Sequence, residues 1–215
     1  MSEPVFRERP AEGEPSGLLV LHHGRGTDEL DLLPLADALD PQRRLHVITP
    51  RAPLTLPGWG GHHWYVVPRV GYPDQQTFTA SYELLSAFHD ELWQRTGLGP
   101  EQTVLGGFSM GSVMSYALAL GPERPAPAGL MAFSGFIPTV EGWSPSFEDR
   151  TALRAFLAHG DRDPVIEVGF GRAAHEALLA GGLEVDYREF AGGHEIPSAI
   201  APEGRRWLGE LLIDR

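Results

Sequence analysis

Short apolar runs of strand length alternate with helix-like segments along the whole chain, and this pattern constrains the fold most strongly. Such an alternation predicts an α/β fold with a mostly parallel central sheet and helices on both of its faces. Several runs are continuously apolar, as expected of strands buried on both faces. The expected strands span residues 5–7, 18–22, 45–49, 103–106, 129–133, 155–158 and 184–190.

The segments between these runs have helical periodicity. One apolar stripe, with steps of three and four residues, predicts a helix that Gly97 would end. Its members are Phe78, Tyr82, Leu85, Phe88 and Leu92. Further helices are expected over residues 30–39, 110–120, 167–180 and 197–212. Two long stretches rich in Gly, Pro and aromatic residues, 50–76 and 134–150, predict ordered loops.

Length and cysteine content limit the classes further. A chain of 215 residues suits one domain, expected to span residues 1–215 without a separate lid domain. The chain contains no cysteine, which excludes disulfide bonds, thiolate metal sites and a cysteine nucleophile.

Charge and hydropathy argue against two kinds of partner. A net charge of −12 would repel nucleic-acid phosphates and anionic membrane surfaces. The apolar runs are shorter than the roughly 20 residues that a membrane-spanning helix needs. Residues 1–17 are charged and lack the apolar core of a secretory signal. We therefore expect a cytoplasmic protein without nucleic-acid or membrane partners, and a homodimer is left open.

Residues 107–111 read Gly-Phe-Ser-Met-Gly and lie between an expected strand and an expected helix, the context of a nucleophile elbow. Glycines two residues before and after Ser109 remove the Cβ atoms that would collide in such a tight turn. The alternative interpretation is a tight turn with an incidental serine.

A serine hydroxyl needs a general base, and the base needs an acid that orients it. His194 follows the last expected strand and Asp163 follows the strand before it, so both lie at the same sheet edge as Ser109. Asp161 is an alternative acid, because Asp163 could instead cap a turn before Pro164.

Other histidines have structural interpretations. His22, His23 and His159 lie at expected strand ends, where packing roles are commoner than catalysis. The side chains of the adjacent histidine pairs 22–23 and 62–63 should point in diverging directions, and neither pair has a carboxylate at a spacing suited to sharing a metal ion. No metal site is therefore expected.

Acyl transfer also needs two N–H donors for the developing oxyanion. Met110 supplies one through its backbone amide. The glycine-containing loop 23–26 supplies the other, for which we select the amide of Arg25. The Arg25 side chain is not needed for this role and could point to solvent or pair with Asp28.

These motifs together resemble the phospholipase/carboxylesterase family of small α/β-hydrolases, which includes the acyl-protein thioesterases. The resemblance rests on His-Gly-x-Gly, Pro-x-Ala-Pro, Gly-Phe-Ser-x-Gly, Phe-Ser-Gly, His-Gly-x-x-Asp-Pro-Val and Gly-His-Glu-Ile, at residues 23–26, 50–53, 107–111, 133–135, 159–165 and 193–196.

The resemblance implies a Ser109–Asp163–His194 triad, an oxyanion hole from Arg25 and Met110, and hydrolysis of esters or thioesters without a cofactor. Met110 and the aromatic stretch 60–65 depart from the thioesterase pattern, which favours a carboxylesterase acting on short to medium esters of small molecules.

The aromatic loops suggest where a substrate would lie. Among their apolar residues, Trp64, Phe136 and Ile137 are expected to contact substrate, with Trp59, Tyr65 and Trp143 as further candidates. Three alternatives stay open: an acyl-protein thioesterase or lysophospholipase, a peptidase or amidase, and a ligand-binding protein of the same fold without turnover.

Overall fold

The computed structural model describes residues 3–214, so the ends of the expected domain, 1 and 215, lie outside the described part. Seven strands form one sheet in the order β1-β3-β2-β4-β5-β6-β7. All neighbouring strands are parallel except β1 and β3. The strands are β1 (Phe6–Arg9), β2 (Gly17–His22), β3 (Leu45–Pro50), β4 (Thr103–Phe108), β5 (Gly129–Phe133), β6 (Arg154–Gly160) and β7 (Glu184–Phe190).

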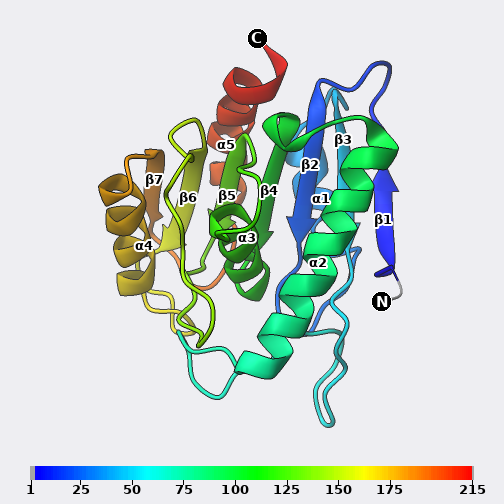
Figure 1. Cartoon of the computed structure of the whole chain (residues 1–215). Helices are drawn as coiled ribbons and strands as arrows, with labels where there is room; N and C mark the ends of the chain where they lie inside the picture. Colours follow the sequence, from blue (N-terminus) through cyan, green and yellow to red (C-terminus); the bar gives the residue numbers. More distant parts are fainter. Residues whose placement is uncertain (1–2, 215) are drawn as a thin grey trace.

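Helices cover both faces of the sheet, so the predicted α/β architecture is confirmed. In Figure 1, α2, α3 and α4 lie in front of the sheet, and α1 and α5 lie behind it. Their bounds are α1 (Leu33–Leu39), α2 (Gln75–Thr96), α3 (Met110–Leu120), α4 (Val168–Ala180) and α5 (Ala201–Leu208). No helix within residues 3–214 combines the length and apolarity needed to cross a membrane.

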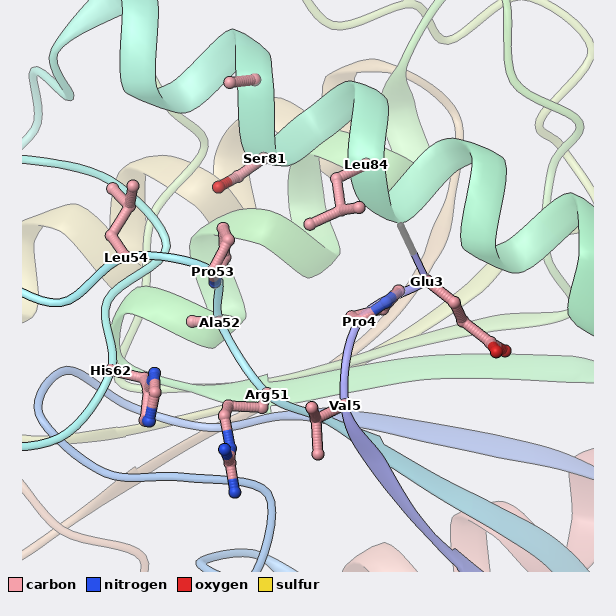
Figure 2. A pocket seen from close by; sticks show the side chains of 11 residues that line it. Glu3, Pro4, Val5, Arg51, Ala52, Pro53, Leu54, His62, Ser81 and Leu84 are labelled. Atoms are coloured by element: carbon pink, nitrogen blue, oxygen red, sulfur yellow. The ribbon is translucent and has the colours of Figure 1, made fainter. Parts of the chain in front are cut away.

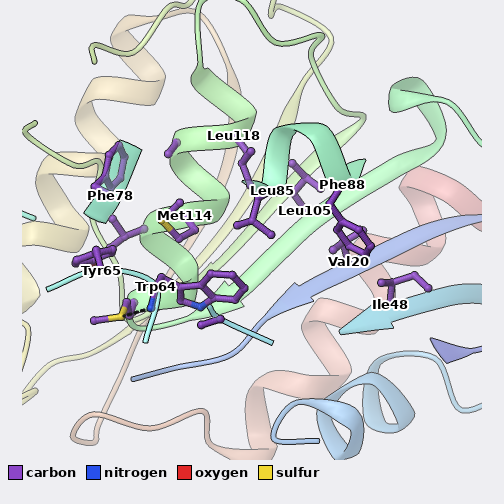
Figure 3. Packing of buried hydrophobic residues seen from close by; sticks show 14 of the residues in the cluster. Val20, Ile48, Trp64, Tyr65, Phe78, Leu85, Phe88, Leu105, Met114 and Leu118 are labelled. Atoms are coloured by element: carbon purple, nitrogen blue, oxygen red, sulfur yellow. Dashed lines mark hydrogen bonds between the residues drawn. The ribbon is translucent and has the colours of Figure 1, made fainter. Parts of the chain in front are cut away.

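The strands divide the core between the two faces by simple alternation. On β2, Leu18 and Val20 join the cluster under α2 and α3, whereas Leu19 and Leu21 join the cluster under α1 and α5. Figure 3 shows the first cluster, in which side chains from α2, α3 and the loop before α2 meet β2, β3 and β4. All four β2 side chains are fully buried, as continuous apolar runs predict.

Three element boundaries differ from expectation. The first strand begins at Phe6 and forms the antiparallel edge, and the helix expected over 30–39 begins at Leu33. The helix expected over 197–212 is divided into a 3₁₀ turn (Ser198–Ile200), α5 and a π turn (Gly209–Ile213). Pro202 in the first turn of α5 explains the division at its start, because proline lacks the N–H that would continue an earlier helix.

Candidate active site

The nucleophile elbow lies between β4 and α3, where Ser109 adopts a positive φ of 56° with ψ of −118°. A Cβ atom on Gly111 would collide with the carbonyl oxygen of His22, and one on Gly107 would lie 2.7 Å from that same oxygen. Only glycine therefore fits at both positions, as the spacing predicts. A strained backbone of this kind persists only where the surrounding structure holds it.

Ser112 and β5 hold the turn in place. The Ser109 N–H donates to the Phe133 carbonyl at 2.9 Å. The Ser112 hydroxyl lies 2.5 Å from the Gly107 oxygen and 2.8 Å from the Phe133 oxygen, and accepts from the Phe133 N–H at 2.9 Å. The serine is thereby fixed at the carboxyl end of the sheet, with only 7% of its surface exposed.

The structure brings Ser109, His194 and Asp163 together from three separate loops. His194 Nε2 lies 2.8 Å from Ser109 Oγ, and His194 Nδ1 lies 2.7 Å from Asp163 Oδ2. The ring of Phe108 packs on the His194 imidazole with 4.8 Å between centroids. This contact restricts the rotation of the imidazole and was not expected from the sequence, although Phe108 adjoins the serine.

The Asp163 carboxylate is fully buried and surrounded by donors. Its Oδ1 accepts the backbone N–H groups of Val165 and Ile166 at 2.8 and 2.9 Å. His159 Nε2, which lies 2.8 Å from the Ile166 carbonyl, is 3.4 Å from Oδ2. Burial alone would raise the pKa of Asp163, but the hydrogen bonds from His194, Ile166 and Val165 outweigh it and lower the pKa.

Asp161, the alternative acid, has different partners. Its side chain is 43% exposed and its Oδ1 accepts the Gly192 N–H at 3.1 Å. The same oxygen pairs with Arg162 at 3.3 Å. Asp161 thus supports the loop that precedes His194, whereas Asp163 contacts the imidazole itself.

Two backbone amides, one at the elbow and one in the loop after β2, are available for an oxyanion. Met110 is the first residue of α3, so its N–H has no carbonyl partner within that helix. Within residues 3–214 the Arg25 N–H makes no backbone hydrogen bond, whereas the next amide, Gly26, donates to the His62 oxygen at 2.9 Å. The Arg25 guanidinium stacks 3.7 Å from the centroid of the Trp59 ring instead of pairing with Asp28.

A pocket of about 920 Å³ opens beside Ser109 and His194 and extends between α1 and α5. Its apolar lining comes mainly from α1, α5 and the loop after His194. These residues are Leu32, Pro34, Leu35, Ala38, Ile196, Pro197, Ala201 and Pro202, with Trp59, Phe108 and Val165 nearer the mouth. No sequence pattern predicts this groove, because it depends on how two helices far apart in the chain pack together.

The three residues expected to contact substrate lie elsewhere. Trp64 is fully buried and its indole N–H donates to the His23 carbonyl at 2.9 Å, so the ring is part of the core. Phe136 and Ile137 line a separate pocket of about 300 Å³ with Phe170, which lies 5.3 Å from Phe136 between ring centroids. Of the aromatic loop candidates, Trp59 alone lines the pocket at Ser109, whereas Trp64 and Phe136 pack their loops onto the sheet.

The remaining histidines at this edge face inward. His22 Nδ1 lies 2.9 Å from Ser115 Oγ, and burial lowers the pKa of His22 to about 3. His23 Nε2 accepts the Ala52 N–H at 3.0 Å, so the two adjacent rings have different partners. No group of three or more metal-binding side chains occurs within the described chain.

Comparison with known proteins places this chain in a family. The profile of the phospholipase/carboxylesterase family matches residues 8–201. Acyl-protein thioesterase 1 of Candida albicans is 29% identical over 147 residues, which cover 64% of this chain and 63% of that protein. The match therefore spans less than two thirds of the length of that relative.

Solved structures match over nearly the whole chain. A carboxylesterase from Mesorhizobium loti superposes with a TM-score of 0.82 at 25% identity, covering 95% of this chain and 93% of that one. Esterase PE8 superposes with a TM-score of 0.80 at 29% identity, covering 98% of this chain and 100% of that one.

Proposed function

Because the chain belongs to the phospholipase/carboxylesterase family, an α/β-hydrolase family, we propose that it hydrolyses carboxylic esters through an acyl-enzyme intermediate on Ser109. The observation that carries the proposal is the pair of hydrogen bonds from Ser109 Oγ to His194 Nε2 and from His194 Nδ1 to Asp163 Oδ2, at 2.8 and 2.7 Å. This arrangement of nucleophile, base and orienting acid has the geometry that acyl transfer requires.

Acylation proceeds by attack of Ser109 Oγ on the ester carbonyl carbon while His194 Nε2 takes the hydroxyl proton. The amides of Arg25 and Met110 donate to the oxyanion, and each such donor is worth about 3 kcal/mol. Collapse of the tetrahedral intermediate breaks the bond to the alcohol oxygen, which receives the proton from His194. The products of this step are the free alcohol and the Ser109 ester.

Deacylation repeats the sequence with water. His194 Nε2 takes a proton from the water molecule, whose oxygen attacks the acyl carbon. The Ser109 oxygen then leaves with that proton, and the carboxylic acid is released. Asp163 stays ionised throughout and stabilises the imidazolium that forms in each half-reaction.

A Ser109→Ala variant tests the proposal most simply. Hydrolysis of 4-nitrophenyl acetate and covalent labelling by a fluorophosphonate should both be lost. Ser134→Ala is a matched control, because Ser134 also follows a strand with a positive φ, of 52°, and its buried hydroxyl has no hydrogen-bond partner among residues 3–214. Labelling that persists in Ser109→Ala would assign the nucleophile to another residue.

A thioesterase activity is the second candidate, because the Candida albicans relative is named an acyl-protein thioesterase. Matched oxyester and thioester substrates with the same acyl group separate the two activities. Stoichiometric ligand binding without turnover of any ester, thioester or anilide would favour the ligand-binding alternative. A cytoplasmic location, a small ester substrate and a homodimer stay predictions from the sequence.

A further inference from the structure

We propose that the groove between α1 and α5 binds the alcohol part of the ester, and that the acyl side of Ser109 accepts only a short chain. The inference rests on the proposed function and adds a substrate class to it: esters of short carboxylic acids with medium-length, uncharged apolar alcohols. Four observations carry it.

The residues on either side of Ser109 point to opposite faces of the sheet. Phe108 packs against the cluster under α1 and α5 and against the His194 ring. Met110 belongs to the cluster under α2 and α3. The serine therefore stands between two regions of different packing, and the two parts of an ester meet different surroundings.

The region around Met110 is filled. Met110 is 4% exposed, and its sulfur accepts the backbone N–H of Trp64 at 3.2 Å, the contact drawn as a dashed line in Figure 3. Trp64 is fully buried, and Tyr65 is 3% exposed in the same cluster. Interiors packed in this way do not admit additional methylene groups without strain.

The region around His194 is open. His194 Nε2 must donate a proton to the leaving alcohol oxygen, so the alcohol lies on the side of Ser109 where the imidazole stands. The groove of about 920 Å³ begins there and continues along the loop that follows His194 to Leu35 and Ala38 of α1 and Ala201 of α5. Its size and apolar lining suit a hydrocarbon chain.

The charged residues of the groove do not favour a charged ligand. Arg25 and Arg205 are balanced by Asp31 and Glu195, and all four are exposed. Arg205 Nε and Nη2 both donate to the Ala38 carbonyl, at 3.1 and 2.7 Å, so that side chain is held at the end of α1. An uncharged alcohol fits this balance better than an acidic or basic one.

A second pocket supplies a control position. This pocket of about 480 Å³, shown in Figure 2, lies between α2, the loop after β3 and the segment before β1, and Ser109 does not line it. Ala80 of α2 lines it, as Ala38 of α1 lines the groove. The same substitution at both alanines separates an effect of the groove from a general effect of a larger side chain on a helix.

The test compares two isomeric esters, hexyl acetate and methyl heptanoate, with rates measured by titration of the released acid. The isomers have the same composition and differ only in the side of the carboxyl group that carries the long chain. We expect kcat/KM for hexyl acetate to exceed that for methyl heptanoate by at least about tenfold, since each buried methylene contributes about fourfold. A preference for methyl heptanoate would overturn the inference.

Ala38→Phe should lower this ratio by about tenfold, by filling the space of roughly two methylene groups. Ala38→Leu should lower it less, and Ala80→Phe should leave it unchanged. A fall in the methyl heptanoate rate alone would show that the groove holds the acyl chain and would overturn the inference. Fluorophosphonate labelling separates failure of this inference from failure of the proposed function. If the unchanged protein is not labelled and hydrolyses no ester, the proposed function itself is refuted.

Discussion

Replacement of Asp163 by Asn changes one atom of the site, and the structure determines where that atom goes. Asp163 Oδ1 accepts two backbone N–H groups, from Val165 at 2.8 Å and Ile166 at 2.9 Å. An amide NH₂ in that position would face two donors and leave both unpaired in a buried place. The amide nitrogen of Asn must therefore occupy the position of Oδ2, 2.7 Å from His194 Nδ1.

This orientation imposes the wrong tautomer on the imidazole. Nδ1 of His194 would accept the hydrogen bond from the Asn amide, so its hydrogen would reside on Nε2. A protonated Nε2 cannot take the Ser109 proton across the 2.8 Å contact. We expect kcat to fall about 10⁴-fold, the size of this effect in Ser-His-Asp triads, which corresponds to about 5.4 kcal/mol of activation free energy.

The assay is the steady-state hydrolysis of 4-nitrophenyl acetate, with circular dichroism to establish that each variant is folded. Asp161→Asn is the control, because its exposed side chain contacts the Gly192 amide and Arg162 instead of the imidazole. Its kcat should stay within about threefold of the unchanged protein, as is usual for surface substitutions. A folded Asp163→Asn variant within about tenfold of the unchanged protein would refute the tautomer argument.

Two further substitutions probe the scaffold. Arg51 donates to the buried Glu29 carboxylate at 2.5 and 2.7 Å and lowers the pKa of Glu29 to about 2 from an ordinary 4.5. The stability that comes from this depressed pKa is present above pH 4.5 and is lost as the pH falls toward 2. Glu29→Gln should therefore lower the free energy of unfolding by about 3 kcal/mol at pH 7 and by about half of that at pH 3. Urea titration at the two pH values measures both differences. Gly111→Ala should reduce fluorophosphonate labelling at least about 100-fold, because its Cβ would displace the strained turn against His22. Gly169→Ala is the control, because a Cβ atom at this position in α4 meets no other atom, and it should leave labelling unchanged. Equal labelling of the two variants would refute the argument that a Cβ atom at Gly111 collides with His22.

The sheet and the placement of the candidate site residues at its edge were accessible from the sequence because both depend on local patterns. Continuous apolar runs predicted several of the parallel strands to within a few residues, since only strands buried on both faces tolerate such runs. The glycines around Ser109 predicted the elbow because no other residue fits there. Strand order then brings the loops that carry Asp163 and His194 to the same edge.

The pocket was not accessible in the same way. The aromatic loop around Trp64 predicts a substrate contact, but the indole N–H donates to the buried His23 carbonyl and the ring is part of the core. Ala38 and Ala201 are separated by most of the chain and form one groove only when α1 and α5 pack together. A residue pattern within one segment does not predict contacts between two helices that are distant in the sequence.

The central claim is that Ser109 carries the acyl group during turnover, and peptide mass spectrometry of a rapidly quenched reaction tests it most directly. After brief mixing with 4-nitrophenyl acetate and acid quenching, the peptide that contains Ser109 should carry the added mass of one acetyl group. The adduct should disappear as substrate is exhausted. Ester turnover with the acetyl group on a different residue, or with no covalent adduct at any time, would contradict the account.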